Sequence, residues 1–247
     1  MKKTPFIWLG ADRARKWSVG DKALLLDKAA HAGLPVPNGA ILLDELFHLF
    51  VQEGVVAMNG TAVTDCDADW LYESLYDGIR FPRFDQPVIL RAAFSALAHE
   101  QMPIASAAKA HVDLNAPDEL ARALCSVWSV SPNSEIAFRR DVLVMEMVEG
   151  KVGGTAVTTK LSAGVTTKDT VTDQITTSDG SLEIPQLTGF FPRTDSSLPP
   201  YAQRLQKLLR GIRRTFGQGS WQIDWLDDGE ICWVVKVVEL QRGKVAK

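Results

Sequence analysis

The sequence predicts an α+β fold, with a helix-bearing first half of the chain and a strand-rich second half. A helix is expected to begin near Asp21. Its apolar stripe is Leu25, Ala29 and Ala32, and the residues that follow, Gly33, Pro35 and Pro37, are ones that end helices. Residues 142–148 and 154–159 are expected to form two strands joined by a glycine-containing turn. Two apolar runs flank residues 227–230 and predict a hairpin over 221–240.

The remaining elements follow from the same periodicities. In the first half, short strands are expected over 6–9, 39–43 and 87–91, and helices over 44–52 and 117–130. In the second half, two strands are expected within 161–184, followed by a helix over 201–216. That last helix has an inward apolar stripe of Leu205, Leu208, Leu209 and Ile212, and its five Lys and Arg residues are expected on a solvated face.

Composition excludes several classes of function. The chain has 247 residues and a formal net charge of -3, which argues against a broad nucleic-acid or acidic-membrane surface. Its three cysteines are scattered and form no zinc-ligand pattern, so a reduced, cytoplasmic setting is expected. No apolar run approaches the ~20 residues that a membrane-spanning helix needs. We therefore expect neither nucleic acid nor a membrane as a partner.

Lys22 is the first candidate site residue. It lies in the first turn of the predicted helix, where the helix dipole disfavours a cation. Lys22 and the free N–H groups of that turn are suited to share an anion, and phosphate is the commonest candidate. The structural alternative is an ordinary solvated lysine on a helix surface.

Two segments in this region resemble a known family. Gly20-Asp21-Lys22 and Ala32-Gly33-Leu34-Pro35-Val36-Pro37 are similar to the start of the ATP-binding domain of phosphoenolpyruvate synthase and pyruvate phosphate dikinase. There a Gly-Gly-Lys segment opens a helix that ends in Ala-Gly-Leu-Pro-Val-Pro, and three further segments match in the same order. The resemblance implies an ATP-grasp-like fold of two subdomains, here expected at 1–140 and 141–247, with a nucleotide cleft between them.

The resemblance also implies roles for seven residues, with ATP and magnesium (Mg²⁺) as cofactors. Lys22 and Arg91 match residues that hold the phosphates, and they are the expected catalytic residues. Met145, Glu146 and Met147 fall on the hinge against which adenine lies. Asp224 falls on a carboxylate that binds magnesium. Lys236 replaces a glutamine ligand, and we expect it to contact phosphate directly as a point charge.

Several departures fall on chemically important positions of the family. Ala92 and Ala93 replace paired serines, Ser95 falls on a threonine, and residues 163–165 are the nearest remnant of a Gly-Leu-Gly-Glu phosphate loop. The leading expectation is phosphotransfer from ATP to a histidine on a separate carrier protein. The alternative is a catalytically inactive domain that binds a nucleotide or a partner protein. A third interpretation is a ligase of the wider ATP-grasp class that uses an acyl-phosphate intermediate.

Overall fold

The computed structural model describes residues 5–60, 62–96, 107–130, 138–160, 171–188 and 193–240. Its contacts divide the chain into two compact units: a first unit of Met1–Asp27 with Asn38–Met147, and a second unit of Lys28–Pro37 with Val148–Lys247. Each unit contains an antiparallel sheet and helices, so the predicted α+β class is confirmed. The expected subdomain boundary at 140/141 stays a prediction, and the segment 163–165 lies outside the described residues.

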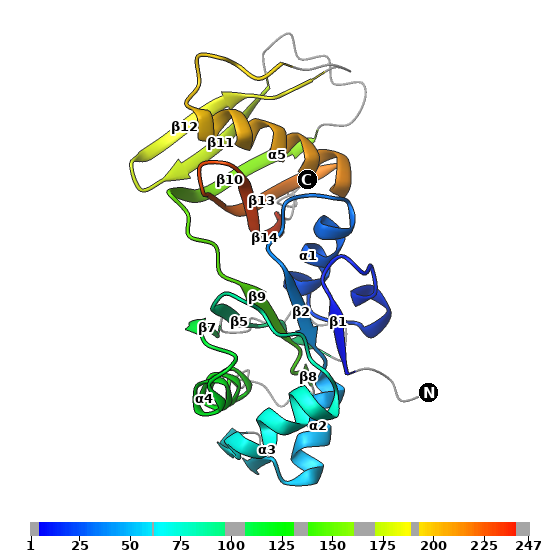
Figure 1. Cartoon of the computed structure of the whole chain (residues 1–247). Helices are drawn as coiled ribbons and strands as arrows, with labels where there is room; N and C mark the ends of the chain where they lie inside the picture. The colour runs from blue at the N-terminus through cyan, green and yellow to red at the C-terminus, as the bar shows by residue number, and fades with distance from the viewer. Residues whose placement is uncertain are drawn as a thin grey trace. The chain divides into compact units, whose positions relative to one another are not determined.

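The first unit is built on a five-stranded antiparallel sheet in the order β1-β2-β9-β5-β7 (Figure 1). Its strands are β1 (Phe6–Trp8), β2 (Gly39–Leu42), β9 (Val142–Glu146), β5 (Val88–Ala92) and β7 (Ala108–Val112). Apolar residues fill β2 and most of β9, as interior positions of a sheet covered on both faces require. The predicted short strands near residues 6, 39, 87 and 142 are thus confirmed.

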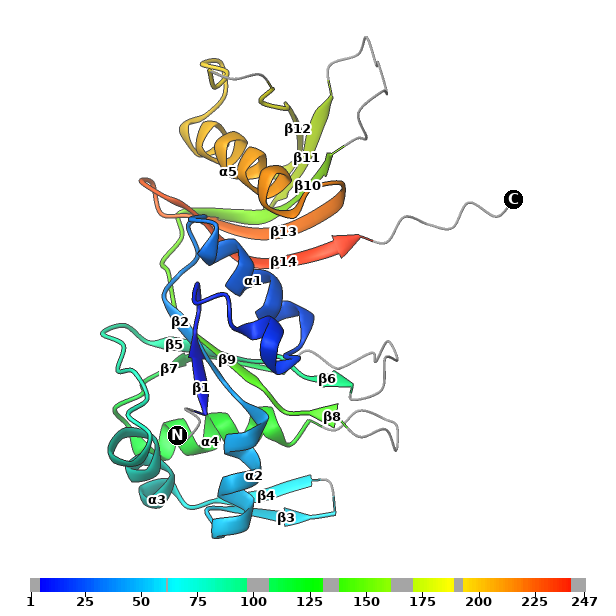
Figure 2. The same cartoon turned by 90° about the vertical axis from the view of Figure 1, so that its right-hand side faces the viewer.

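Helices cover both faces of this sheet, as Figure 2 shows for α2, α3 and α4 on one side and the start of α1 on the other. The helices are α1 (Asp21–His31), α2 (Asp44–Glu53), α3 (Ala68–Glu73) and α4 (Pro117–Trp128), with short turns at η1 (Ala14–Trp17) and η2 (Ser74–Gly78). Two small ladders complete the unit: β3 (Val56–Asn59) with β4 (Ala62–Cys66), and β6 (Ser95–Ala96) with β8 (Phe138–Arg139). The main core lies on the α2, α3 and α4 side.

The buried stripe of α1 differs from the predicted one. The buried apolar residues of the helix are Ala23, Leu26 and Ala29, whereas Leu25 is half-buried and Ala32 is exposed. The cause is Asp27, whose buried carboxylate accepts hydrogen bonds from the N–H groups of Gly10 at 2.8 Å and Ala14 at 3.0 Å. Satisfying that carboxylate turns the Asp27 side of the helix inward.

The second unit contains the antiparallel sheet β12-β11-β10-β13-β14, with α5 against one face (Figures 1 and 2). Its elements are β10 (Val152–Lys160), β11 (Thr172–Thr177), β12 (Gly180–Pro185), α5 (Pro200–Phe216), β13 (Gly219–Asp227) and β14 (Cys232–Leu240). The predicted hairpin over 221–240 is confirmed as β13 and β14. The predicted pairing of 142–148 with 154–159 is wrong, because β9 belongs to the first sheet and β10 to the second.

Two arginines of α5 are not on a solvated face. The Arg213 Nη1 atom donates to Asp173 Oδ2 and to Thr158 Oγ1, both at 2.6 Å, and all three residues are buried. Arg204 binds the buried carboxylate of Asp227 through Nε and Nη2, at 2.7 Å and 2.6 Å. The expectation of five solvated cations is therefore wrong for these two, since a buried carboxylate on the sheet needs a cationic partner.

Residues 28–37 pack within the second unit. The Pro35 carbonyl accepts the Val234 N–H of β14 at 2.8 Å. The Lys28 Nζ atom lies 5.1 Å from the centroid of the Phe216 ring. Gly33 has the predicted left-handed conformation, with φ of +78°, where the helix ends. Among the described helices, none combines the length and the apolar character that crossing a bilayer requires.

Candidate functional site

The first turn of α1 is joined directly to the chain that leaves β5. The Gly20 N–H donates to the Ala93 carbonyl at 3.1 Å, and the Ser95 hydroxyl donates to the Ser18 carbonyl at 2.9 Å. A Cβ atom on Gly20 would lie 2.5 Å from the carbonyl oxygens of both Ala93 and Phe94. Only glycine permits this approach of two backbone segments. In turn, the Ala93 N–H donates to the Asp141 carbonyl at 2.9 Å, which attaches the same segment to the start of β9.

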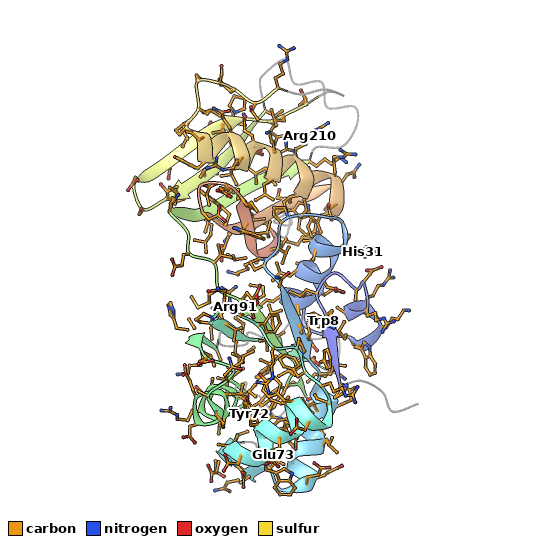
Figure 3. All side chains as sticks on the ribbon, viewed as in Figure 1. Trp8, His31, Tyr72, Glu73, Arg91 and Arg210 are labelled. Carbon is orange, nitrogen blue, oxygen red and sulfur yellow. The ribbon has the colours of Figure 1, made fainter. Side chains whose placement is uncertain are left out.

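This junction joins the two backbone segments that carry the predicted phosphate ligands. Lys22 lies two residues after Gly20, and Arg91 lies two residues before Ala93, so each is close in sequence to one end of the hydrogen bond. Both side chains are half-buried and both have interaction partners. Figure 3 labels Arg91 in the sheet of the first unit, where it pairs with Leu143 of β9 and Ala108 of β7.

Arg91 lies on the sheet face away from the main core. Side chains alternate along a strand, and its neighbours Leu90 and Ala92 belong to the core cluster covered by α2, α3 and α4. Ile89 and Arg91 therefore share the opposite face with their cross-strand partners, Met145 and Leu143. A cation on this face and a helix N-terminus, whose first N–H groups lack intrahelical partners, are each suited to an anion. Asp21 adds a carboxylate to the same helical turn, and phosphate would have to bind despite its charge.

In the predicted adenine hinge, one side chain is buried and two backbone N–H groups are already hydrogen-bonded. Met145 is buried against the Gly39 backbone, since a Cβ atom added to Gly39 would lie 2.9 Å from Met145 Cγ. The N–H groups of Glu146 and Met147 donate to the carbonyls of Asn38 and Pro87, each at 2.9 Å. Any base recognition by these two residues must therefore use acceptor atoms or side chains. The hinge roles of Met145, Glu146 and Met147 stay predictions.

Two neighbours of the hinge were not found from the sequence. The Asn38 Nδ2 atom donates to Glu146 Oε2 at 2.7 Å. The His111 N–H lies 3.0 Å from Met147 Sδ and donates to it, from a residue with φ of +58°. These partners stand 108 and 36 residues away in sequence. No local pattern could have indicated the pairs, because each depends on the order of strands in the sheet.

In the second unit, the predicted metal ligand and the predicted phosphate contact form an ion pair. Asp224 on β13 stands directly opposite Lys236 on β14, and Asp224 Oδ2 lies 3.2 Å from Lys236 Nζ. Both side chains remain about one-third exposed, at 31% and 34%. Exposed pairs of this kind contribute about 0.2–1 kcal/mol to stability, so a stronger ligand can separate them. The strand register shifts just after Asp224, which marks a β-bulge next to the pair.

The described residues do not form a ready-made magnesium site. Magnesium is bound by hard oxygen ligands, commonly one or two carboxylates together with substrate phosphates. Within the described part of the chain, no three His, Cys, Asp or Glu side chains gather closely enough to hold a metal. Asp224 offers one carboxylate, and Lys236 already neutralises it. The magnesium role of Asp224 stays a prediction that depends on breaking this ion pair.

Comparisons with known proteins find a distant similarity to solved structures. No family model and no curated protein matches the sequence. The structure is similar to D-alanine–D-alanine ligase from Helicobacter pylori, with TM-score 0.47 and 14% identity over 87% of this chain and 52% of that one. It is also similar to a RimK domain ATP-grasp protein from Sphaerobacter thermophilus, with TM-score 0.41 and 15% identity over 89% and 59%.

A third similar structure is an ADP complex of N5-carboxyaminoimidazole ribonucleotide synthetase, with TM-score 0.46 and 9% identity over 91% of this chain and 46% of that one. The chain thus spans about half the length of the structures it matches. Similarities at this distance carry no argument about substrate or reaction.

Proposed function

We propose that the first unit binds the phosphates of ATP at the start of α1. The observation that carries this proposal is the hydrogen bond between the Gly20 N–H and the Ala93 carbonyl. This hydrogen bond joins the two backbone segments that carry Lys22 and Arg91, which are the residues expected to hold phosphate. The resemblance to dikinase-type ATP-binding domains suggests the nucleotide, and the half-buried state of both cations and the helix start at Lys22 support a phosphate as the ligand.

We infer further that the bound ATP serves phosphotransfer to a histidine on a separate carrier protein. In such a transfer, the protein positions the phosphates and neutralises their charge. Lys22 and Arg91 would do this in the first unit. The roles of Asp224 as a metal ligand and of Lys236 as a phosphate contact remain separate predictions for the second unit. Magnesium would supply charge neutralisation when it is bound with the nucleotide.

One observation favours the alternative, a domain that binds nucleotide without catalysis. Ser95 falls on a threonine of the dikinase family, and its hydroxyl donates to the Ser18 carbonyl. Ala92 and Ala93 supply no hydroxyl groups nearby. Magnesium-dependent consumption of ATP in the presence of a histidine carrier would support phosphotransfer. Binding without consumption would support the alternative.

Replacing Lys22 by alanine is expected to weaken ATP binding by about tenfold or more, the effect of one charge-assisted hydrogen bond. The measurement is isothermal titration calorimetry with ATP, with and without magnesium. Lys16→Ala is the matched control, because Lys16 is an exposed cation shortly before the same helix. Equal affinity in wild type and Lys22→Ala would refute the phosphate role of Lys22. No binding by the wild type would refute the proposed function.

Replacing Lys236 by methionine is expected to make ATP binding more dependent on magnesium. The substitution removes the cation that neutralises Asp224, and it leaves that carboxylate available to a metal. In calorimetry, magnesium should then raise ATP affinity several-fold more in Lys236→Met than in the wild type. Lys160→Met, an exposed lysine on β10 of the same sheet, should behave as the wild type does. An identical magnesium response in both variants contradicts the metal role of Asp224.

A further inference from the structure

Two cysteines of the first unit meet at a cavity away from the residues discussed above. Cys66 ends β4, and Cys125 lies in the last two turns of α4. Both line a cavity of about 480 Å³, together with Asp65, Asp118 and Arg122. The two thiols are close enough to hydrogen-bond to each other. Both residues are half-buried, and neither is in a disulfide.

The elements that carry these cysteines are held together independently of the thiols. The Ser129 hydroxyl, at the end of α4, donates to the Val63 carbonyl of β4 at 3.1 Å and to the Cys125 carbonyl at 2.6 Å. On the other side of Cys66, the Asp67 carboxylate accepts the Trp70 N–H at 2.9 Å and begins α3. The backbone around both cysteines is therefore positioned, and thiol contact does not depend on loop motion.

We propose that Cys66 and Cys125 are a modification site, at which peroxide forms a reversible disulfide that ties β4 to α4. One thiol, as its thiolate, attacks hydrogen peroxide and becomes a sulfenic acid with loss of hydroxide, which leaves as water after protonation. The second thiol attacks the sulfenic sulfur, forms the S–S bond and releases a second water. Two thiols and one peroxide thus give one disulfide and two waters, and an external thiol reverses the bond.

The cavity favours a small uncharged oxidant over an anionic disulfide such as oxidised glutathione. Two carboxylates and one guanidinium line it, and Arg122 Nε already donates to the Asp118 carbonyl. Burial raises the pKa of the Cys66 thiol, and the hydrogen bond with Cys125 raises it further. The Cys66 thiol is therefore mostly protonated at neutral pH, and its oxidation accelerates as pH rises.

The test treats the full chain with hydrogen peroxide at pH 7, 8 and 9 and follows free thiols and intact mass. The expected product has one free thiol instead of three and a mass lower by about 2 Da, with Cys66 linked to Cys125 in the peptide map. Its formation should accelerate about tenfold per pH unit. The oxidised protein should melt about 5–10 °C higher, and a phosphine reductant should reverse this shift.

Three variants complete the test. Cys66→Ser and Cys125→Ala should each abolish the mass change and the shift in Tm, and using two sites guards against a variant that does not fold. Cys232→Ala should keep both effects, because Cys232 is buried in β14 of the second unit. A disulfide involving Cys232, or oxidation of Cys66 or Cys125 to a sulfinic acid without a crosslink, would overturn the proposal.

Discussion

Arg213→Met is expected to lower the free energy of unfolding by about 3–5 kcal/mol, because it leaves a buried carboxylate without its cation. Asp173 is 1% exposed, and its carboxylate accepts from Arg213, from Thr158 at 2.6 Å and from the Gln186 amide at 2.7 Å. Two neutral donors remain after the substitution, but they cannot replace the charge. The measurement is denaturant unfolding followed by tryptophan fluorescence, which Trp221 and Trp225 of the same unit report.

The neighbouring Arg214 provides a matched control. It is exposed in the last turn of α5, so Arg214→Met should change the free energy of unfolding by less than about 0.5 kcal/mol. The double variant Arg213→Met with Asp173→Leu should recover most of the loss, since it removes the buried charge together with its partner. A loss in Arg213→Met no larger than in Arg214→Met would show that the ion pair is not what holds α5 to the sheet.

Gly20→Ala is expected to destabilise the protein by about 2–3 kcal/mol, the cost of forcing a side chain into closely packed backbone. Its Cβ atom would lie 2.5 Å from two carbonyl oxygens, and neither can move as a flexible side chain does. The first turn of α1 must shift away from the end of β5. If ATP binds as proposed, its affinity should also fall by about tenfold, because Lys22 and Arg91 are then separated.

Gly33→Ala separates these effects from the loss of a glycine as such. Gly33 ends the same helix with φ of +78°, and a Cβ atom added to it would meet no neighbouring atom within 4 Å, so alanine there meets backbone strain without a clash. We expect it to cost about 1 kcal/mol and to leave ATP affinity unchanged. Thermal unfolding and calorimetry on both variants provide the comparison. Equal losses of stability and affinity in the two variants would contradict a special role for the Gly20 junction.

Most elements of the fold were predictable from local patterns. The helix from Asp21, the left-handed exit at Gly33 and the final hairpin around Gly229 all depend on residues within one or two turns of each other. Apolar periodicity, capping and turn chemistry act over the same short range. The inward stripe of α5 was predictable for this reason as well, and Leu205, Leu208, Leu209 and Ile212 are all buried.

The pairing of strands and the burial of charged side chains depended on the tertiary structure instead. Residues 142–146 and 152–160 have strand patterns, yet a pattern does not state which sheet a strand joins, and β9 and β10 join different ones. The phase of α1 was decided by Asp27, whose hydrogen-bond partners Gly10 and Ala14 precede the helix. Arg213 and Arg204 look like surface cations in sequence, and the buried carboxylates of Asp173 and Asp227 draw them inward.

For the candidate site too, the residue types were predictable from the sequence, whereas the contacts between distant segments were not. Lys22 and Arg91 were identifiable as residue types suited to phosphate, on a helix start and a strand end. That these two segments meet is seen only in the fold, where hydrogen bonds from Gly20 and Ser95 join them, and the pairing of Asp224 with Lys236 is a consequence of strand register. Local sequence determines conformation because its interactions span a few residues. Contacts between distant residues depend on which sheet faces and edges can be buried together, and only the folded chain decides that.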